Sequence, residues 1–277
     1  MDLQFPVEVE NLCFSQKEVG NIVAPRLSYS YMQVDEDDFV LDIHNVASYR
    51  VQKGKEVCIC PHKNSDIASI RLFLNGSVLA AVLHQQHLLP FHGSSLIYDN
   101  MGVIICGHAG IGKSSVALAL CQNGGQFIND DITPVRIGQS GPTIMPIKTH
   151  IKLWDDSLQK LNIEYDHLER IRPTINKFYL PAQKYFSMET PLNQIFILGT
   201  HNENEFNVTE LKGMEKFDKL RKQIYRKSYL KGMPETRKSY FKQILQIIES
   251  VRVTVVTRPQ LCDIYDTMKC IQKELAK

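Results

Sequence analysis

The amino-acid sequence predicts a mixed α/β protein whose first part is a small β-rich lobe. Short apolar runs separated by turn residues recur from Phe5 to Pro61, and an apolar stripe with helical spacing follows over residues 65–89. A third pattern, over residues 103–123, is an apolar strand followed by a glycine-rich loop and an apolar helix. We therefore expect an N-terminal lobe over residues 1–88 and a larger α/β domain over residues 89–277.

The composition is ordinary for a globular enzyme, because 43% of the 277 residues are apolar and 22% are charged. No stretch approaches the roughly 20 continuous apolar residues that a membrane-spanning helix requires. Residues 1–14 contain acidic side chains in place of the apolar core of a signal peptide. We expect a cytoplasmic protein without a membrane role.

The seven cysteines are scattered and include no C-x-x-C pair, which favours reduced thiols. Zinc ligation by Cys58, Cys60 and His62 is an alternative interpretation of one part of this set. Their spacing differs from that of zinc sites, whereas Cys-Ile-Cys is typical of a strand whose alternate residues share one face. We expect a strand there and no metal.

In the N-terminal lobe, strands are expected at residues 40–43, 49–51 and 57–60. The helix that follows has Ser65 as a suitable N-cap, and Pro90 is expected to end it. We place the lobe boundary close to this proline.

The larger domain should begin with a hairpin and a βαβ unit. The expected elements are strands at residues 94–98 and 103–107 joined by a turn, a helix at 112–123 and a strand at 126–130. Further along, we expect a helix at 155–168, a strand at 194–199, helices at 216–230 and 236–250, a strand at 251–256 and a last helix after Pro259.

Residues 107–114 match G-x-x-x-x-G-K-[ST], the P-loop (Walker A) pattern that cradles phosphates with backbone amides. A bound triphosphate would lie over the N-terminus of the following helix, where free N–H groups and the helix dipole favour an anion. In such loops the lysine, here Lys113, reaches the β- and γ-phosphates, and the hydroxyl of Ser114 ligates Mg²⁺. The predicted nucleotide site comprises Gly107, His108, Ala109, Gly110, Ile111, Gly112, Lys113, Ser114 and Ser115. The alternative is a glycine-rich turn without a ligand.

Two adjacent carboxylates, Asp130 and Asp131, follow the expected strand at residues 126–130. A right-handed crossover would bring the end of that strand beside the phosphate loop. A kinase needs one carboxylate to accept the hydroxyl proton of the acceptor and another group to complete the metal shell. The alternative is a structural turn, in which Asp-Asp is common.

His92 can be placed by counting across the hairpin. If Tyr98 pairs with Val103, then Ser94 lies opposite Gly107 and His92 lies opposite the start of the loop. We therefore include His92 with Asp130 and Lys113 among the candidate catalytic residues, with a structural role as the alternative.

A basic segment runs from Lys212 to Lys242, although the formal net charge of the chain is only +2. One interpretation is a solvated helical face, because Phe217, Leu220 and Ile224 recur at helical spacing. The other is a docking face for an acidic protein, peptide or nucleic acid. No nucleic-acid-binding motif accompanies it, so we do not expect nucleic acid.

Three elements in this order resemble the catalytic domain of HPr kinase/phosphorylase and its relatives, including peptide-tailoring kinases. They are Phe91-His92-Gly93, the loop from Gly107 to Ser114, and Asn129-Asp130-Asp131. The resemblance extends through Arg71-Leu72-Phe73-Leu74, Leu88-Leu89-Pro90-Phe91-His92 and Lys152-Leu153-Trp154.

This resemblance implies a P-loop core similar to that of HPr kinase and phosphoenolpyruvate carboxykinase. It implies that Asp130 deprotonates a serine hydroxyl and that Asp131 and Ser114 form the metal site, with ATP and Mg²⁺ as cofactors. It also implies that oligomers are possible. The N-terminal lobe does not resemble that of true HPr kinases, so the acceptor is not expected to be HPr. Arg170, Arg172 and Lys177 lie in a polar segment that could close over phosphates, with a surface role as the alternative for the two arginines.

The leading hypothesis is a kinase that transfers the γ-phosphoryl group of ATP to a serine hydroxyl of a peptide or protein. A non-catalytic, ATP-gated binding module is a second hypothesis, which needs Lys113 but not Asp130. A small-molecule kinase is a third. The sequence lacks the N-K-x-D motif of GTPases and the L-S-G-G-Q motif of transporter ATPases, which argues against both classes.

Overall fold

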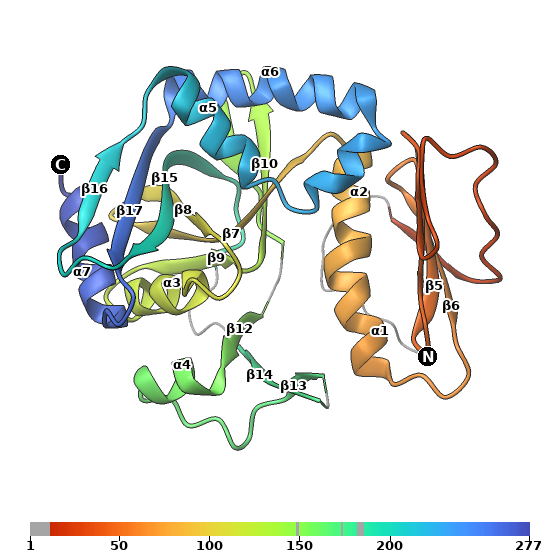
Figure 1. Cartoon of the computed structure of the whole chain (residues 1–277), viewed down its shortest axis with the longest axis horizontal. Coiled ribbons are helices and arrows are strands. Elements are labelled where there is room, and N and C mark those ends of the chain that lie inside the picture. The colour runs from red at the N-terminus through yellow and green to blue at the C-terminus, as the bar shows by residue number, and fades with distance from the viewer. Residues whose placement is uncertain (1–11, 148–149, 173, 182–185) are drawn as a thin grey trace.

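The computed structural model describes residues 12–147, 150–172, 174–181 and 186–277. Within these ranges the strands form three sheets, and the predicted mixed α/β class is confirmed (Figure 1). Residues 1–11, which include most of the acidic N-terminal stretch and the start of the expected lobe, lie outside the described residues.

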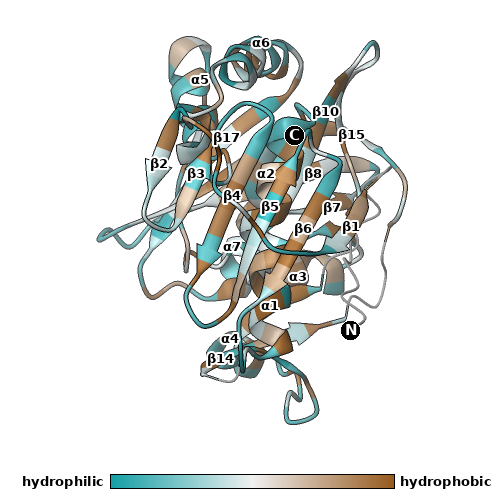
Figure 2. Cartoon of the chain, turned by 90° about the vertical axis from the view of Figure 1, so that its right-hand side faces the viewer, coloured by the Kyte–Doolittle hydropathy of each residue, from teal (hydrophilic) through white to brown (hydrophobic). Residues whose placement is uncertain are grey.

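A six-stranded sheet forms the first part of the chain. Its strands are β1 (Cys13–Gln16), β2 (Leu27–Tyr29), β3 (Met32–Val34), β4 (Asp38–Ile43), β5 (Ala47–Gln52) and β6 (Glu56–Pro61), in the spatial order β1-β6-β5-β4-β3-β2. Along β5, Ala47, Tyr49 and Val51 are buried while the residues between them are half-buried, as expected for a strand with one face on the core. In Figure 2, β5 carries both brown and teal segments along its length. The β-rich character predicted for this region is confirmed.

One continuous helix, made of α1 (Ile67–Phe73), a π-helical turn η1 (Leu74–Val78) and α2 (Leu79–Gln85), lies against this sheet (Figure 1). It is long and apolar enough to cross a membrane by length and mean hydropathy, although polar residues such as Arg71 and Asn75 interrupt its apolar run. However, 67% of its apolar window is buried inside the protein, as in the core helix of a soluble protein.

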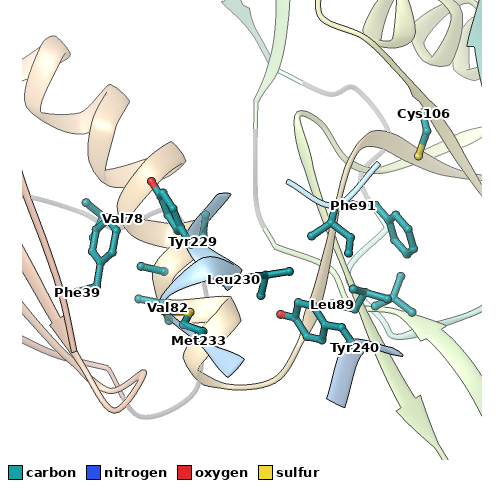
Figure 3. Packing of buried hydrophobic residues seen from close by; sticks show 14 of the residues in the cluster. Phe39, Val78, Val82, Leu89, Phe91, Cys106, Tyr229, Leu230, Met233 and Tyr240 are labelled. Carbon is teal, nitrogen blue, oxygen red and sulfur yellow. The ribbon is translucent and has the colours of Figure 1, made fainter. Parts of the chain in front are cut away.

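The same helix connects the sheet to the rest of the molecule (Figure 3). Val78 and Val82 of this helix pack in one apolar cluster with Phe39 of β4 and Tyr229 of the segment that follows α5, and the ring centroids of Phe39 and Tyr229 are 4.8 Å apart. The apolar cluster continues into Phe91, beyond the expected lobe boundary. A continuous apolar core therefore crosses residue 88.

The ends of this helix differ from the sequence expectation. Asp66, not Ser65, is the N-cap: its backbone is extended (φ −85°, ψ 144°) and its carboxylate accepts a hydrogen bond from the amide of Ser69 at 2.7 Å. The helix ends at Gln85 because His87 adopts a left-handed conformation (φ +56°), and Pro90 lies inside the next strand.

Replacing Asp66 with alanine is expected to lower the free energy of unfolding by about 1 kcal/mol, because the amide of Ser69 loses its acceptor. Ser65→Ala is the matched control and should change it by no more than a few tenths of a kcal/mol. Urea denaturation of the two variants measures both values. Equal losses in the two variants would contradict the cap assignment.

The large sheet is built from eight strands. They are β7 (Leu89–Tyr98), β8 (Met101–Gly107), β9 (Gln126–Asn129), β10 (Ile132–Gly138), β11 (Gly141–Ile144), β15 (Thr190–His201), β16 (Asn207–Glu210) and β17 (Arg252–Pro259). The spatial order is β11-β10-β7-β8-β15-β17-β16, with β9 on β7. Strands β8, β15 and β17 are parallel, so their carboxyl ends meet at one edge.

Four helices cover the two faces of this sheet (Figure 1). α3 (Lys113–Gln122) and α7 (Ile264–Leu275) pack on one face, and α5 (Gly213–Lys222) and α6 (Pro234–Ser250) on the other. Alternate residues of β8 enter the two cores: Val103 and Ile105 face α3, whereas Ile104 and Cys106 face α6. The predicted elements near 112–123, 194–199, 236–250, 251–256 and the C-terminus are confirmed. The helix expected around residues 216–230 is shorter: α5 ends at Lys222, Arg226 is left-handed (φ +49°), and a 3₁₀ turn η2 (Lys227–Lys231) follows.

The expected βαβ unit is corrected in one respect. β7 pairs antiparallel with both β8 and β9, so β8 and β9 point the same way but β7 lies between them. The chain leaving α3 crosses over β7 before it forms β9. The carboxyl end of β9 still reaches the phosphate loop, because Asp130, the residue after β9, accepts a hydrogen bond from Ser114.

The expected helix over residues 155–168 is also corrected. Only α4 (Asp155–Lys160) is helical, and Asn162 interrupts the chain with a left-handed conformation (φ +53°). The surrounding residues form a three-stranded antiparallel sheet of β12 (Ile151–Trp154), β14 (Ile175–Leu180) and β13 (Arg170–Arg172). β10, β11 and β16, which are short strands at or near the sides of the large sheet, were not predicted from the sequence.

Candidate active site

The glycine-rich loop joins the end of β8 to the start of α3. Gly107, Gly110 and Gly112 all have positive φ angles, of 147°, 80° and 93°, which residues with a Cβ rarely adopt. A Cβ on Gly107 would also lie 2.9 Å from the carbonyl oxygen of Leu198, whereas one on Gly110 would meet nothing within 4 Å. The loop thus wraps around an open space above the N-terminus of α3, the geometry that suits an anion.

Lys113 is the first residue of α3 and is only 7% exposed. Its ammonium lies 3.1 Å from Nε2 of His92 and donates to the carbonyl of His108, also at 3.1 Å. Burial lowers the pKa of Lys113, although the carboxylates of Asp131 and Asp130 oppose this shift. Burial therefore strips water from the ammonium beside the loop, and contacts with a bound phosphate would compensate for the lost hydration energy.

His92 connects the lysine to the acidic pair. Its Nδ1 lies 3.1 Å from the carbonyl oxygen of Asp131, which can only accept, so Nδ1 carries the proton and Nε2 accepts from Lys113. Burial and the Lys113 ammonium lower the pKa of His92, which fits the neutral ring that this arrangement requires.

The hairpin brings His92 to this place in a register that differs from the predicted one. A two-residue turn, Asp99 and Asn100, with φ angles of 47° and 63°, pairs Tyr98 with Met101 and Gly93 with Cys106. The predicted pairing of Tyr98 with Val103 was wrong by two residues. An even shift leaves every side chain on the same face, so the expectation that His92 lies near the loop is confirmed.

Asp130 is 1% exposed and is held from three directions. Its Oδ1 accepts from the hydroxyls of Ser114 at 2.7 Å and Ser94 at 2.5 Å, and its Oδ2 accepts from the backbone amide of Lys152 at 2.8 Å. Of the two carboxylates, Asp130 is therefore the one in contact with the P-loop serine. Ser115, the next residue, is buried.

Asp131 lies in a tight γ-turn, with φ +69° and a hydrogen bond from the amide of Ile132 to the carbonyl of Asp130. Its carboxylate accepts from Nζ of Lys152 at 3.0 Å and lies 3.5 Å from Nδ1 of His92. Burial alone would raise the pKa of Asp131, but the Lys152 ammonium, which donates to this carboxylate, holds it well below its usual range. A non-glycine residue held at positive φ is a form of strain that concentrates at functional sites.

These residues line a pocket of about 530 Å³ beneath the three-stranded sheet. The lining comprises His92, Ala109, Gly110, Gly112, Lys113, Ser114, Ser115, Asp130, Asp131, Lys152, Leu153, Trp154, Asp155, Asp156, Ser157 and Lys177. Lys177 reaches it because it pairs with Trp154 across β12 and β14, with its ammonium 5.8 Å from the indole ring. Arg170 and Arg172 are not part of the lining, and Arg170 lies over the ring of Phe178.

Two contributions were not foreseen from the sequence. Lys152 bonds both carboxylates, one through its backbone and one through its side chain, and the only signal in the sequence was its place in the Lys-Leu-Trp motif. Arg258, near the end of β17, donates to the carbonyls of Ile111 at 3.0 Å and Cys262 at 3.2 Å, and so supports the loop from behind. Its position follows from the parallel pairing of β17 with β15, which no local pattern indicates.

The donor set of the pocket fits Mg²⁺, which prefers oxygen ligands and commonly takes one or two carboxylates together with phosphate oxygens. Ser114, Asp130 and Asp131 supply such oxygens. Elsewhere, Cys58 contacts Ser15 at 3.1 Å and His62 contacts Asp42 at 3.1 Å. Within the described ranges, no group of three or more His, Cys, Asp or Glu residues is arranged to hold a metal ion by itself.

Comparison with known proteins supports the resemblance found in the sequence. Residues 85–153 match the family described as HPr Serine kinase C-terminal domain, a stretch that contains His92, the whole loop, the acidic pair and Lys152. Over these residues the chain is therefore similar to that family.

Among solved structures, the HPr(Ser) kinase/phosphatase from Coxiella burnetii aligns over 68% of this chain and 90% of its own, with 14% sequence identity and a TM-score of 0.37. No curated protein sequence matches the chain.

Proposed function

We propose that this protein is an ATP- and Mg²⁺-dependent kinase that phosphorylates a serine hydroxyl of a peptide or protein in the cytoplasm. One observation carries the proposal: within the segment that matches the HPr serine kinase family, the P-loop lysine, the P-loop serine and both carboxylates converge on a single pocket. The described cysteines are all free thiols, which agrees with the proposed compartment.

In the proposed reaction, the serine oxygen of the acceptor forms a bond to the γ-phosphorus of ATP while the bond from that phosphorus to the β–γ bridging oxygen breaks. ADP leaves, and the hydroxyl proton passes to a carboxylate of the pocket. The loop amides and Lys113 would hold the phosphates, because the transition state of phosphoryl transfer is stabilised mainly by positioning and charge neutralisation. Bound Mg²⁺ would neutralise charge on the β- and γ-phosphates.

The contacts of the two carboxylates favour metal binding by one and proton acceptance by the other. Asp130 is bonded to Ser114 and nearly inaccessible, so it is the natural partner of Ser114 at the metal ion. Asp131 is more exposed, with 26% of its side chain accessible, and faces the pocket beside His92. We therefore propose Asp131 as the carboxylate that receives the hydroxyl proton, the reverse of the roles implied by the sequence resemblance.

His92 would hold the catalytic group together without itself transferring a proton. It accepts from Lys113 and donates to the backbone of Asp131, so it fixes the distance between the phosphate-binding lysine and the acidic pair. Lys152 would keep Asp131 ionised. Lys177, from the opposite strand, is available to contact a phosphate at the mouth of the pocket.

Calorimetric titration of ATP with and without Mg²⁺, followed by transfer of labelled γ-phosphate to serine-containing peptides, tests the proposal. We expect Mg²⁺-dependent binding and labelled phosphoserine. Label on a small-molecule hydroxyl but on no peptide would identify a small-molecule kinase. Binding without transfer to any acceptor would favour an ATP-gated binding module, and absence of binding would refute the proposal.

A further inference from the structure

A groove bounded by α5, η2 and α6 has no part in the proposed phosphate chemistry. It encloses about 770 Å³, and its apolar lining consists of Phe217, Ile224, Leu230, Tyr240, Phe241 and Ile244. Phe241 is 52% exposed and packs edge-on against Phe217, with the ring centroids 5.1 Å apart. A large aromatic side chain at the mouth of an apolar groove is typical of a binding surface.

The rim of this groove is basic. Its charged residues are Arg221, Lys227, Lys231, Arg237 and Lys238, and all five are exposed. The groove lining, as far as the structure describes it, contains no acidic residue. Arg221 and Lys238 are paired with Asp218 and Glu235, whereas the other three form no ion pair with any described residue. The rim therefore carries positive charge that the surrounding protein only partly neutralises.

The floor of the groove is attached to the strand that carries His92. Ile224 lines the groove, and its neighbours on either side are hydrogen-bonded to β7. The carbonyl of Gln223 accepts from the amide of His92 at 2.7 Å, and the amide of Tyr225 donates to the carbonyl of Pro90 at 2.8 Å. The ring of Tyr225 also lies 5.3 Å from that of His92. A chain bound in the groove would thus rest on a segment that is in direct contact with the candidate active site.

We propose that this groove docks an acidic, amphipathic segment of the polypeptide that carries the acceptor serine, an inference that rests on the proposed kinase function. Apolar side chains of that segment fill the groove, and its Asp and Glu residues face the basic rim. The apolar floor suits the apolar side chains of a peptide, and the positive rim is opposite in charge to carboxylates. Two helices flanking an apolar cleft form the kind of surface that receives an amphipathic helix.

The test selects binders from a library of random 12-residue peptides displayed on phage, without nucleotide, and measures the best one by fluorescence anisotropy. The enriched peptides should combine apolar residues with Asp or Glu, and their affinity should fall between 50 and 500 mM NaCl because the ion pairs are exposed. Lys227→Glu/Lys231→Glu and, separately, Phe241→Ser should each weaken binding about tenfold or more.

Matched controls carry the same chemical changes elsewhere. Lys269→Glu/Lys273→Glu alters two exposed lysines of α7, and Leu261→Ser removes an apolar side chain that is 99% exposed. Both controls should bind the peptide like the wild type. The proposal would be overturned by equal binding to groove and control variants, by enrichment of basic or purely polar peptides, or by a dimer in light scattering that Phe241→Ser dissociates.

Because the binding assay contains no nucleotide, its result is separate from that of the kinase proposal. Groove-dependent peptide binding without phosphate transfer would support the docking site and refute the proposed kinase activity. The selected peptide, extended by a serine, can also be tested as an acceptor. If wild type and groove variants phosphorylate it at the same rate, the kinase activity is supported and the docking proposal is refuted.

Discussion

Lys113→Ala is expected to weaken binding of MgATP by about 100-fold, or roughly 3 kcal/mol, because a charge-assisted contact to the phosphates is lost from a buried site. Phosphate transfer should fall further, by about 1000-fold, since the same ammonium stabilises the charge that moves during transfer. Calorimetry and a labelled-phosphate assay measure the two effects.

The unfolding midpoint of Lys113→Ala shows whether weaker MgATP binding comes from a lost ligand contact or from a destabilised fold. The Lys113 amine is buried in the ligand-free protein and its pKa is lowered by that burial, so its removal should not destabilise the protein. The unfolding midpoint should stay the same or rise. Lys160→Ala, which changes an exposed lysine of α4, is the control and should bind MgATP like the wild type. If Lys113→Ala binds MgATP within twofold of wild type, the loop is not the phosphate site.

The pair Asp131→Asn and Asp130→Asn should separate proton acceptance from metal binding. We expect Asp131→Asn to lose about 1000-fold or more in transfer while MgATP binding changes little, because the amide cannot accept the hydroxyl proton. We expect Asp130→Asn to lose the Mg²⁺-dependent part of ATP binding, because Ser114 would keep a neutral partner in place of a carboxylate. Titrations of ATP with and without Mg²⁺ measure the Mg²⁺-dependent contribution to ATP affinity.

The opposite outcome would restore the division of roles implied by the sequence resemblance. If Asp131→Asn loses Mg²⁺-dependent binding and Asp130→Asn loses only transfer, then Asp130 is the base and Asp131 the metal ligand. Since Asp131→Asn leaves the Lys152 ammonium without its ionised partner, thermal unfolding of both variants must accompany the activity data. Strong depression of the Asp131 pKa does not exclude its role, because the position of the carboxylate matters more than its basicity in this chemistry.

The parts of the site that depend on local backbone chemistry could be predicted from the amino-acid sequence. Gly107, Gly110 and Gly112 occur where positive φ angles are required, and Lys113 follows directly as the first helical residue. The apolar runs on either side predicted β8 and α3 because alternation and helical spacing are local properties of the chain. His92 was placed near the loop even though its register was wrong, because a shift of two residues preserves the face of a strand.

The residues that complete the site come from distant segments, and their positions could not be predicted without the fold. Lys152 and Lys177 enter the pocket because β12 and β14 pair across a segment that the sequence suggested was partly helical. Arg258 reaches the loop through the pairing of β17 with β15. The groove beside His92 likewise depends on the packing of α5 and η2 against α6. Such contacts depend on long-range pairing, where the free energy of burial outweighs local propensity, so no window of sequence contains them.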